Sequence, residues 1–175
     1  PSQLNASGLL RMSECQFQGH FPFARVDLAD QTVPVDVSIE GWSPFIPRDS
    51  DASSLPVAIL EVTLRNTTDS AVEATVLLSG ENVVGWPEIS GAVSEWVDEG
   101  GLRGILMRNP EHGPDSPHHG SIALLTSHED VTWELHREVA HQFQVLEELL
   151  DGFGTTGELP DNTDCPPATG PFAPI

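Results

Sequence analysis

The stretch that decides the fold is residues 19–56, which read G-H-F-P-F-A-R-V-D-L-A-D-Q-T-V-P-V-D-V-S-I-E-G-W-S-P-F-I-P-R-D-S-D-A-S-S-L-P. Proline fixes its own backbone angle and restricts the residue before it, so a helix across this stretch is excluded by Pro34, Pro44, Pro47 and Pro56. Within it, residues 35–40 alternate between apolar and polar side chains, which is typical of a strand with one face in water. The stretch therefore predicts strands interrupted by a stiff loop.

The same alternation recurs along the chain and predicts an all-β fold, an antiparallel β-sandwich with one peripheral α-helix near the C-terminal end. Strands are expected at 23–28, 33–42, 57–65, 72–79, 104–108, 121–127 and 131–136, with a short edge strand at 15–17. Strands 57–65 and 72–79 are expected to pair as a hairpin through the turn at 66–70. Residues 80–101 are expected to form a long connection that carries Trp86 and Trp96.

Helical spacing occurs once, over residues 138–151. The apolar residues of this segment recur at intervals of four, three and four, and Gly152 is expected to end the helix. The following residues are rich in Gly, Thr and Pro, which predicts an irregular tail.

The charge balance is strongly acidic. Among 175 residues there are 27 Asp and Glu against seven Arg and no Lys, for a formal net charge of −20. Such a surface repels phosphate backbones and anionic headgroups, so we expect neither nucleic acid nor membrane as a partner. The acids fit salt adaptation or a solubility bias, or calcium binding; the run Asp49-Ser50-Asp51 lacks the glycine and closing glutamate of an EF-hand loop. Cys15 and Cys165 could pair with each other, but neither has metal-site spacing, and free thiols in a cytoplasmic protein are favoured.

Residues 19–56 resemble the N-terminal domain of glycoside hydrolase family 116, the family of the non-lysosomal glucosylceramidases. The matching strings are F-P-F-A-R-V at 21–26, V-P-V-D-V-S-I-E at 33–40, S-P-F-I-P at 43–47 and S-S-L-P-V at 53–57. Weaker likeness in order and spacing continues as far as Leu159. The helix departs from the family pattern, because Phe143 is its single aromatic residue where the family usually has a pair.

The resemblance implies a non-catalytic β-sandwich that precedes and supports a helical catalytic domain, which would hydrolyse β-glucosides or glucosylceramide with retention. It implies a lead-in at 1–18, an incomplete sandwich at 19–160 and a Pro-rich tail at 161–175 that leads to missing strands. A sandwich without its last strands exposes sheet edges, so we expect this piece to be marginally stable alone. In the family both catalytic carboxylates lie in the helical domain, so no catalytic residue is carried over. An enzyme of the same type with a different substrate stays open.

Three segments of the chain carry residues that are candidates for docking or ligand binding. The proline-stiffened loop presents Phe45, Ile46 and Pro47, which are candidates for docking on the helical domain or for folding back on their own sandwich. Trp86 and Trp96 are candidates for sugar stacking, on the alternative that the chain is a free-standing carbohydrate-binding module. No cofactor is expected, and the His-rich loop at 109–120 is interpreted as a surface loop rather than a metal site.

Overall fold

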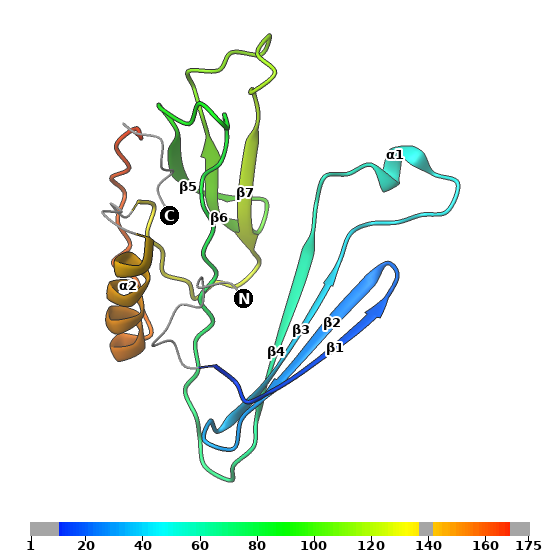
Figure 1. The fold of residues 1–175 in the computed structure, drawn as a ribbon, viewed down its shortest axis with the longest axis vertical. Coiled ribbons are helices and arrows are strands. Elements are labelled where there is room, and N and C mark those ends of the chain that lie inside the picture. Colours follow the sequence, from blue (N-terminus) through cyan, green and yellow to red (C-terminus); the bar gives the residue numbers. More distant parts are fainter. Residues whose placement is uncertain (1–10, 137–141, 169–175) are drawn as a thin grey trace, which may run out of the picture. The chain divides into compact units, whose positions relative to one another are not determined.

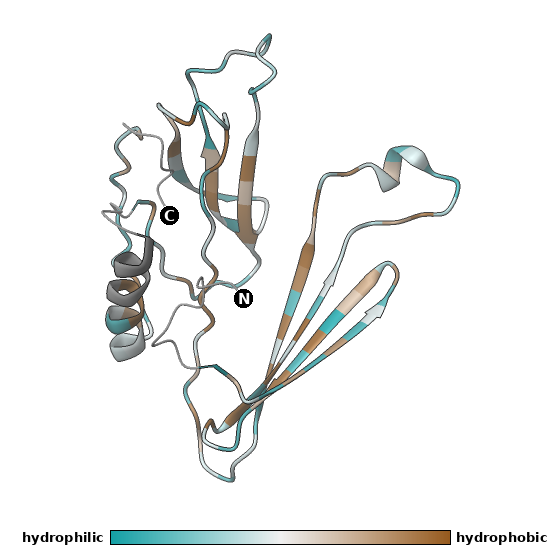
Figure 2. Cartoon of the chain, viewed as in Figure 1, coloured by the Kyte–Doolittle hydropathy of each residue, from teal (hydrophilic) through white to brown (hydrophobic). Residues whose placement is uncertain are grey.

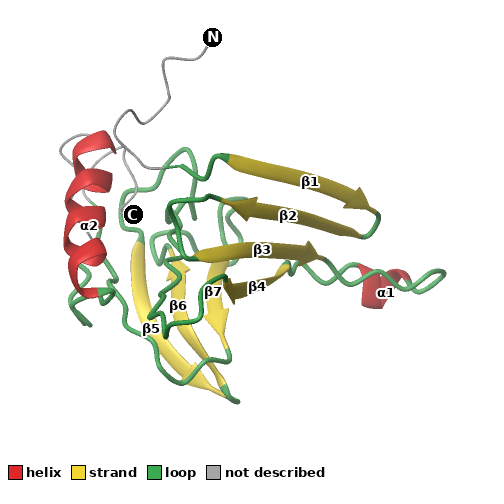
Figure 3. Cartoon of the chain, turned by 90° about the horizontal axis from the view of Figure 1, so that it is seen from below, coloured by secondary structure: helices red, strands yellow, loops and turns green. Residues whose placement is uncertain are grey.

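The structure is a computed structural model that describes residues 11–136 and 142–168. The chain divides into two compact units, Pro1–Thr75 and Val76–Ile175, and each contains one antiparallel sheet. The described helices are α1 (Ser50–Ser53) and α2 (Gln142–Thr156) (Figure 3). The expected all-β class is therefore confirmed, and two antiparallel sheets are consistent with a sandwich. Among the described residues, no helix has both the length and the apolar character that crossing a membrane requires.

The first unit is a four-stranded antiparallel sheet in the order β1-β2-β3-β4 (Figure 1). Its strands are β1 (Glu14–His20), β2 (Phe23–Ala29), β3 (Val35–Trp42) and β4 (Ile59–Asn66). Asp30 holds the turn between β2 and β3. Its carboxylate accepts hydrogen bonds from the Thr32 hydroxyl (2.6 Å), the Thr32 N–H (2.8 Å) and the Ser13 N–H (3.0 Å). These bonds favour the charged form and hold the pKa of Asp30 well below its usual range.

The register of this sheet separates an apolar face from a polar face, because residues opposite one another on neighbouring strands share a face. Ile39 pairs with Val26 on β2 and with Val62 on β4, so apolar side chains continue across three strands. The next residue, Glu40, pairs with Arg25 and lies on the other face. Figure 2 shows the resulting alternation of apolar and polar residues along the strands.

The second unit contains a three-stranded antiparallel sheet in the order β5-β6-β7. The strands are β5 (Val93–Glu99), β6 (Leu102–Arg108) and β7 (Ser121–Thr126). Gly100 and Gly101 join β5 to β6, with φ of 63° and 81°. Positive φ at both positions of a two-residue hairpin turn is the geometry that glycine adopts without steric cost.

Buried residues of the second unit gather around the segment 82–92. Ile89 and Ala92 have 1% and 0% of their surface exposed. Asn82 is also fully buried; its amide donates to the Val93 carbonyl at 2.9 Å and its oxygen accepts from the Val84 N–H at 3.2 Å. A loop that brings its polar backbone into a core in this way needs side-chain partners for that backbone, and Asn82 supplies them.

The predicted hairpin of 57–65 with 72–79 is wrong. The first strand is present as β4, but it pairs with β3, and no strand follows at 72–79. The turn itself forms: the Asn66 oxygen accepts from the Thr68 N–H at 2.8 Å, and its amide donates to the Ser70 carbonyl at 2.7 Å. The sheet of this unit therefore ends at β4, which is an edge strand in the described part of the chain.

The strand predicted at 131–136 is also absent, because side chains take the place of a neighbouring strand. Asp161 Oδ1 accepts from the Trp133 N–H and Asn162 Oδ1 from the Leu135 N–H, both at 2.8 Å. The expected connection at 80–101 contains β5, so Trp96 lies on a strand. The short strand expected at 15–17 is longer and runs over the whole of β1.

Helix α2 is confirmed in type, but its predicted end is wrong. It continues through Gly152 to Thr156, and Gly157 closes it with φ of 71° and an N–H that donates to the Phe153 carbonyl at 2.7 Å. A glycine in the left-handed region just past the last turn is the usual helix stop. The start predicted at 138 falls at residues outside the described part.

Candidate functional site

The loop between β3 and β4 extends beyond the ends of these strands and carries α1 (Figure 1). It presents Phe45 and Ile46, of which 49% and 51% is exposed, and Pro47 beside them is exposed as well. Other large apolar side chains of the same unit are exposed to a similar extent, for example Leu55 and Leu60 at 55% and 57%, so exposure alone does not single out these two residues. The docking candidates therefore lie at an accessible position in their own unit.

Hydrogen bonds inside the loop fix this position. The Ser53 hydroxyl accepts from the Ile46 N–H at 2.9 Å and donates to the Ile46 carbonyl at 3.0 Å. Asp49 caps α1, because its carboxylate accepts from the Ala52 N–H at 2.9 Å. The loop is thus ordered by its own polar groups, and its apolar residues are held in place without being buried.

An aromatic contact joins this loop to the β1–β2 hairpin. The rings of Phe45 and Phe21 meet edge to face with centroids 5.0 Å apart and an interplanar angle of 72°. Phe21 is 76% exposed. We call Phe21, Phe45 and Ile46 the apolar tip of the first unit. Edge-to-face packing orients the two rings and leaves about half of Phe45 and most of Phe21 exposed for a further contact.

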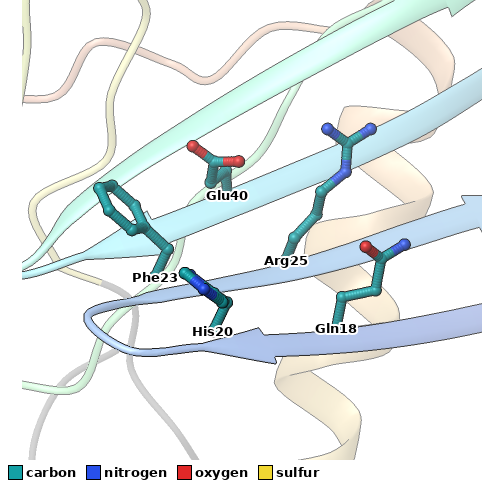
Figure 4. Close-up of a pocket in the computed structure, with 5 residues that line it drawn as sticks. All are labelled: Gln18, His20, Phe23, Arg25 and Glu40. Atoms are coloured by element: carbon teal, nitrogen blue, oxygen red, sulfur yellow. The ribbon is translucent and has the colours of Figure 1, made fainter.

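A hollow of about 410 Å³ lies on the polar face of the same sheet. Figure 4 shows its five lining side chains, which rise from three neighbouring strands. These residues are Gln18 and His20 on β1, Phe23 and Arg25 on β2, and Glu40 on β3. The lining therefore combines an amide, an imidazole, a guanidinium and a carboxylate with one aromatic ring.

Electrostatics in the hollow centre on Arg25. The Arg25 Nε donates to the Asp27 carboxylate at 2.9 Å and 3.1 Å, and an Nη of Arg25 lies 2.9 Å from Asp27 Oδ1. The hydrogen bond to Asp27 raises the pKa of Arg25, and the same bond lowers the pKa of Asp27. Glu40 adds a second negative charge near the guanidinium, so the surroundings of Arg25 carry no net positive charge.

An aromatic pair bounds one end of the hollow. Phe23 pairs with Trp42 in the register, with ring centroids 6.0 Å apart and an interplanar angle of 45°. Sequence reasoning missed this site because the five lining residues come from three strands. The alternation within 23–28 and 35–42 places Phe23, Arg25, Glu40 and Trp42 on polar-side positions, but only the pairing of β2 with β3 places them together.

The two tryptophans proposed for sugar stacking lie in different settings. Trp86 is 64% exposed in the segment before β5. Trp96 on β5 is half-buried and stacks on Trp133, with centroids 3.8 Å apart and an angle of 15°. The Trp133 Nε1 donates to the Asn162 carbonyl at 3.1 Å, so its ring is held from both sides. Trp86 and Trp96 are therefore not gathered on one stacking face by any contact within the described part of the second unit.

The histidines of the 109–120 loop contact the main chain. His112 Nε2 lies 2.8 Å from the Glu88 carbonyl, and His119 Nδ1 lies 2.8 Å from the His112 carbonyl. The His112 and His118 rings are 5.5 Å apart. Within the described ranges, no three His, Cys, Asp or Glu residues are grouped as a metal site would need. Cys15 and Cys165 are free thiols, and Cys165 Sγ accepts from the Ser94 N–H at 3.2 Å.

Comparison with known proteins gives one family. A family model described as beta-glucosidase 2, glycosyl-hydrolase family 116 N-term, matches residues 2–171 of the chain. The matched range includes strands β1–β7, the apolar tip and the hollow. A search of curated proteins finds no match.

Proposed function

Because this chain belongs to the N-terminal domains of glycosyl-hydrolase family 116, we propose that it is a non-catalytic support for a helical catalytic domain. That domain would hydrolyse a β-glucoside or glucosylceramide with retention of configuration. In this proposal residues 1–18 are a lead-in, residues 19–160 form most of a β-sandwich, and residues 161–175 lead to further strands. The function of the chain is then to pack on its catalytic partner and stabilise it.

The observation that carries the proposal is the apolar tip. Phe45 and Ile46 are half-exposed, yet Ser53 and Asp49 hold their loop in one conformation. A surface that is ordered before binding loses less conformational entropy when it docks, and buried aromatic and aliphatic anchors dominate interface energies. A rigid apolar loop end thus fits the role of an anchor on a second domain.

Two carboxyl groups of the first unit, those of Asp27 and Asp30, fit a non-catalytic role. Retaining hydrolysis uses two carboxyl groups about 5–5.5 Å apart, and the general acid needs a raised pKa. Hydrogen bonds lower the pKa of Asp27 and of Asp30, which is the opposite direction. Both groups are committed to structural contacts, Asp27 with Arg25 and Asp30 with the β2–β3 turn.

The test replaces Phe45 and Ile46 by Ser in the complete protein that contains this chain. Full burial of such a side chain stabilises by about 1.5–3 kcal/mol, and about half of each is still exposed, so the pair would contribute about 1.5–3 kcal/mol to docking. We expect a lower melting temperature of the catalytic domain and lower glucosidase activity. The matched control is Val76→Ser with Leu78→Ser, which removes apolar side chains of similar exposure, 51% and 59%, from the second unit.

Two results would contradict the proposal. One is an unchanged melting temperature and activity in the Phe45→Ser, Ile46→Ser protein, or an equal loss in the Val76→Ser, Leu78→Ser control. The other is glucosidase turnover above background by the 175-residue chain alone, since a support has no chemistry of its own. The complete reading frame gives a further check, because it has to encode a helical domain after this one.

The alternative is a free-standing carbohydrate-binding module that uses Trp86. Its support is the 64% exposure of this ring. Glycan binding measured by calorimetry, with Trp86→Ala as the comparison, tests it. Loss of binding in that variant, together with no effect of the Phe45→Ser, Ile46→Ser change, would favour the module over the support.

A further inference from the structure

We propose that the hollow on the polar face of β1–β3 is a binding subsite for a neutral sugar, specifically for a β-linked glucose unit. Its walls are the side chains of Gln18, His20, Phe23, Arg25 and Glu40 (Figure 4). Its volume of about 410 Å³ falls within the ~300–1,000 Å³ of small-molecule sites. The site is separate from the apolar tip and does not depend on the support role.

The chemistry of the walls matches a polyhydroxylated ring. A hydroxyl both donates and accepts, so its recognition needs donors and acceptors together. Gln18 supplies both, the guanidinium of Arg25 supplies the N–H donors that do not bond to Asp27, and Glu40 supplies acceptors. Phe23, 42% exposed, offers a ring against which the C–H face of a pyranose can pack, and Trp42 extends that apolar surface.

Charge excludes the other small ligands that such a hollow suggests. A phosphate or sulfate ester needs net positive surroundings, but Arg25 is paired with Asp27 at 2.9 Å and lies near Glu40. A quaternary ammonium group needs an aromatic cage without a neighbouring cation, and here Arg25 is one of the walls. A neutral polar ligand remains, and the beta-glucosidase family of the chain indicates β-linked glucose.

The position of the lining residues on paired strands favours a site that is ordered before a ligand binds. All five walls stand on paired strands, and the Arg25 side chain is oriented by Asp27 before any ligand arrives. Glu40 pairs in the register with Glu61 on its other side, so two like charges face each other on β3 and β4. Arg25 on β2 lies opposite Glu40 and offsets part of this repulsion, since opposite charges facing each other across a sheet attract. The carboxylate of Glu40 can accept hydrogen bonds from the hydroxyl groups of a ligand.

The experiment uses the complete protein and measures its retardation during native gel electrophoresis through a soluble β-glucan, hydroxyethyl cellulose. We expect Phe23→Ala to weaken the retardation about tenfold or more and Glu40→Gln about threefold or more. Trp86→Ala and Thr63→Ala, an exposed change on the polar face of β4, are matched controls and should leave it unchanged. The α-glucan pullulan should not retard the protein.

Glu40→Gln guards against a folding artefact, because it removes a like-charge contact with Glu61. Hydrogen exchange with cellotetraose provides a readout on the unmodified protein, and we expect protection at residues 18–25 and 40–42. Four results would overturn the inference. The first is retardation that persists in both the Phe23→Ala and the Glu40→Gln protein, because it would then come from a catalytic centre. The others are loss of retardation in Trp86→Ala alone, equal retardation in pullulan, and no retardation at all. The Phe45→Ser, Ile46→Ser protein should still be retarded, so failure of the support role and failure of this site give different results.

Discussion

Replacing Asn109 by Ala should destabilise the second unit more than most single substitutions. Asn109 is 3% exposed, and its amide nitrogen lies 3.0 Å from the Ser90 carbonyl, with the Glu88 and Val84 carbonyls at 3.4 and 3.5 Å. Its oxygen accepts from the Glu111 N–H at 3.1 Å. One side chain thus supplies partners to backbone groups on both sides of it.

The magnitude follows from the groups left without partners. The two shortest bonds, to the Ser90 carbonyl and from the Glu111 N–H, each satisfy a part-buried backbone group, and a fully buried group that loses its partner costs about 1–3 kcal/mol. Water entering the vacated space offsets part of the sum, so we expect a loss of about 2–4 kcal/mol in the free energy of unfolding. The matched control, Asn66→Ala, removes a similar pair of bonds at an exposed turn, where water replaces them, and should cost less than about 1 kcal/mol.

Urea denaturation followed by tryptophan fluorescence measures this effect directly. Trp86, Trp96 and Trp133 belong to the second unit, so its unfolding dominates the signal. Reasoning from buried hydrogen bonds is refuted if Asn109→Ala lowers the stability no more than Asn66→Ala. A change in the slope of the transition rather than its midpoint would also contradict it, since the native contacts are then not what changed.

Two further substitutions follow from the structure. Asp30→Asn should make the stability of the chain less dependent on pH in acid. The lowered pKa of Asp30 contributes stability that is present above about pH 3.9 and is lost as the pH falls toward the folded-state pKa. Urea midpoints between pH 2 and 6 that match those of the unmodified chain would contradict this. Gly104→Ala should disrupt the pairing of β6 with β7 and lower the free energy of unfolding by roughly 3 kcal/mol or more, because the added Cβ would lie 1.9 Å from the Leu124 carbonyl oxygen. The control in the same denaturation assay is Gly113→Ala, whose Cβ would meet nothing within 4 Å.

Alternation of apolar and polar residues predicted individual strands well and strand pairing poorly. The strands predicted at 23–28 and 33–42 match β2 and β3 within a few positions, because a strand with one buried face has apolar residues at every second position. Residues 72–79 carry the same period without being a strand, and Val76 and Leu78 within them are 51% and 59% exposed, so alternation alone established neither a buried face nor a hydrogen-bonded neighbour. At 131–136 the side chains of Asp161 and Asn162 accept the backbone hydrogen bonds that a neighbouring strand would accept, and the local sequence pattern does not reveal such distant partners.

The hollow shows why a site can be harder to predict than the strands that carry it. A single tryptophan in a predicted connection is enough to suggest sugar stacking, and on that basis the sequence predicts Trp86 and Trp96 as candidates. Phe23 and Trp42 are 19 positions apart along the chain, and what joins them is the β2–β3 register, which also sets Arg25 opposite Glu40. Two strands predicted correctly still leave their register open, and a shift of one residue moves every side chain to the other face.

The most specific part of the family resemblance, residues 43–56, has a structural reason to be specific. Ser53 holds both polar backbone groups of Ile46, and Asp49 caps α1, so the polar residues of the string keep the apolar ones in place. The same loop leaves β3 directly after Trp42, which lies beside Phe23 at the end of the hollow. Changes in the loop that free Ile46 should therefore alter docking first and the sugar site only through the end of β3. A Ser53→Ala protein that lost β-glucan retardation while keeping its melting temperature would reverse that order and refute the separation of the two sites.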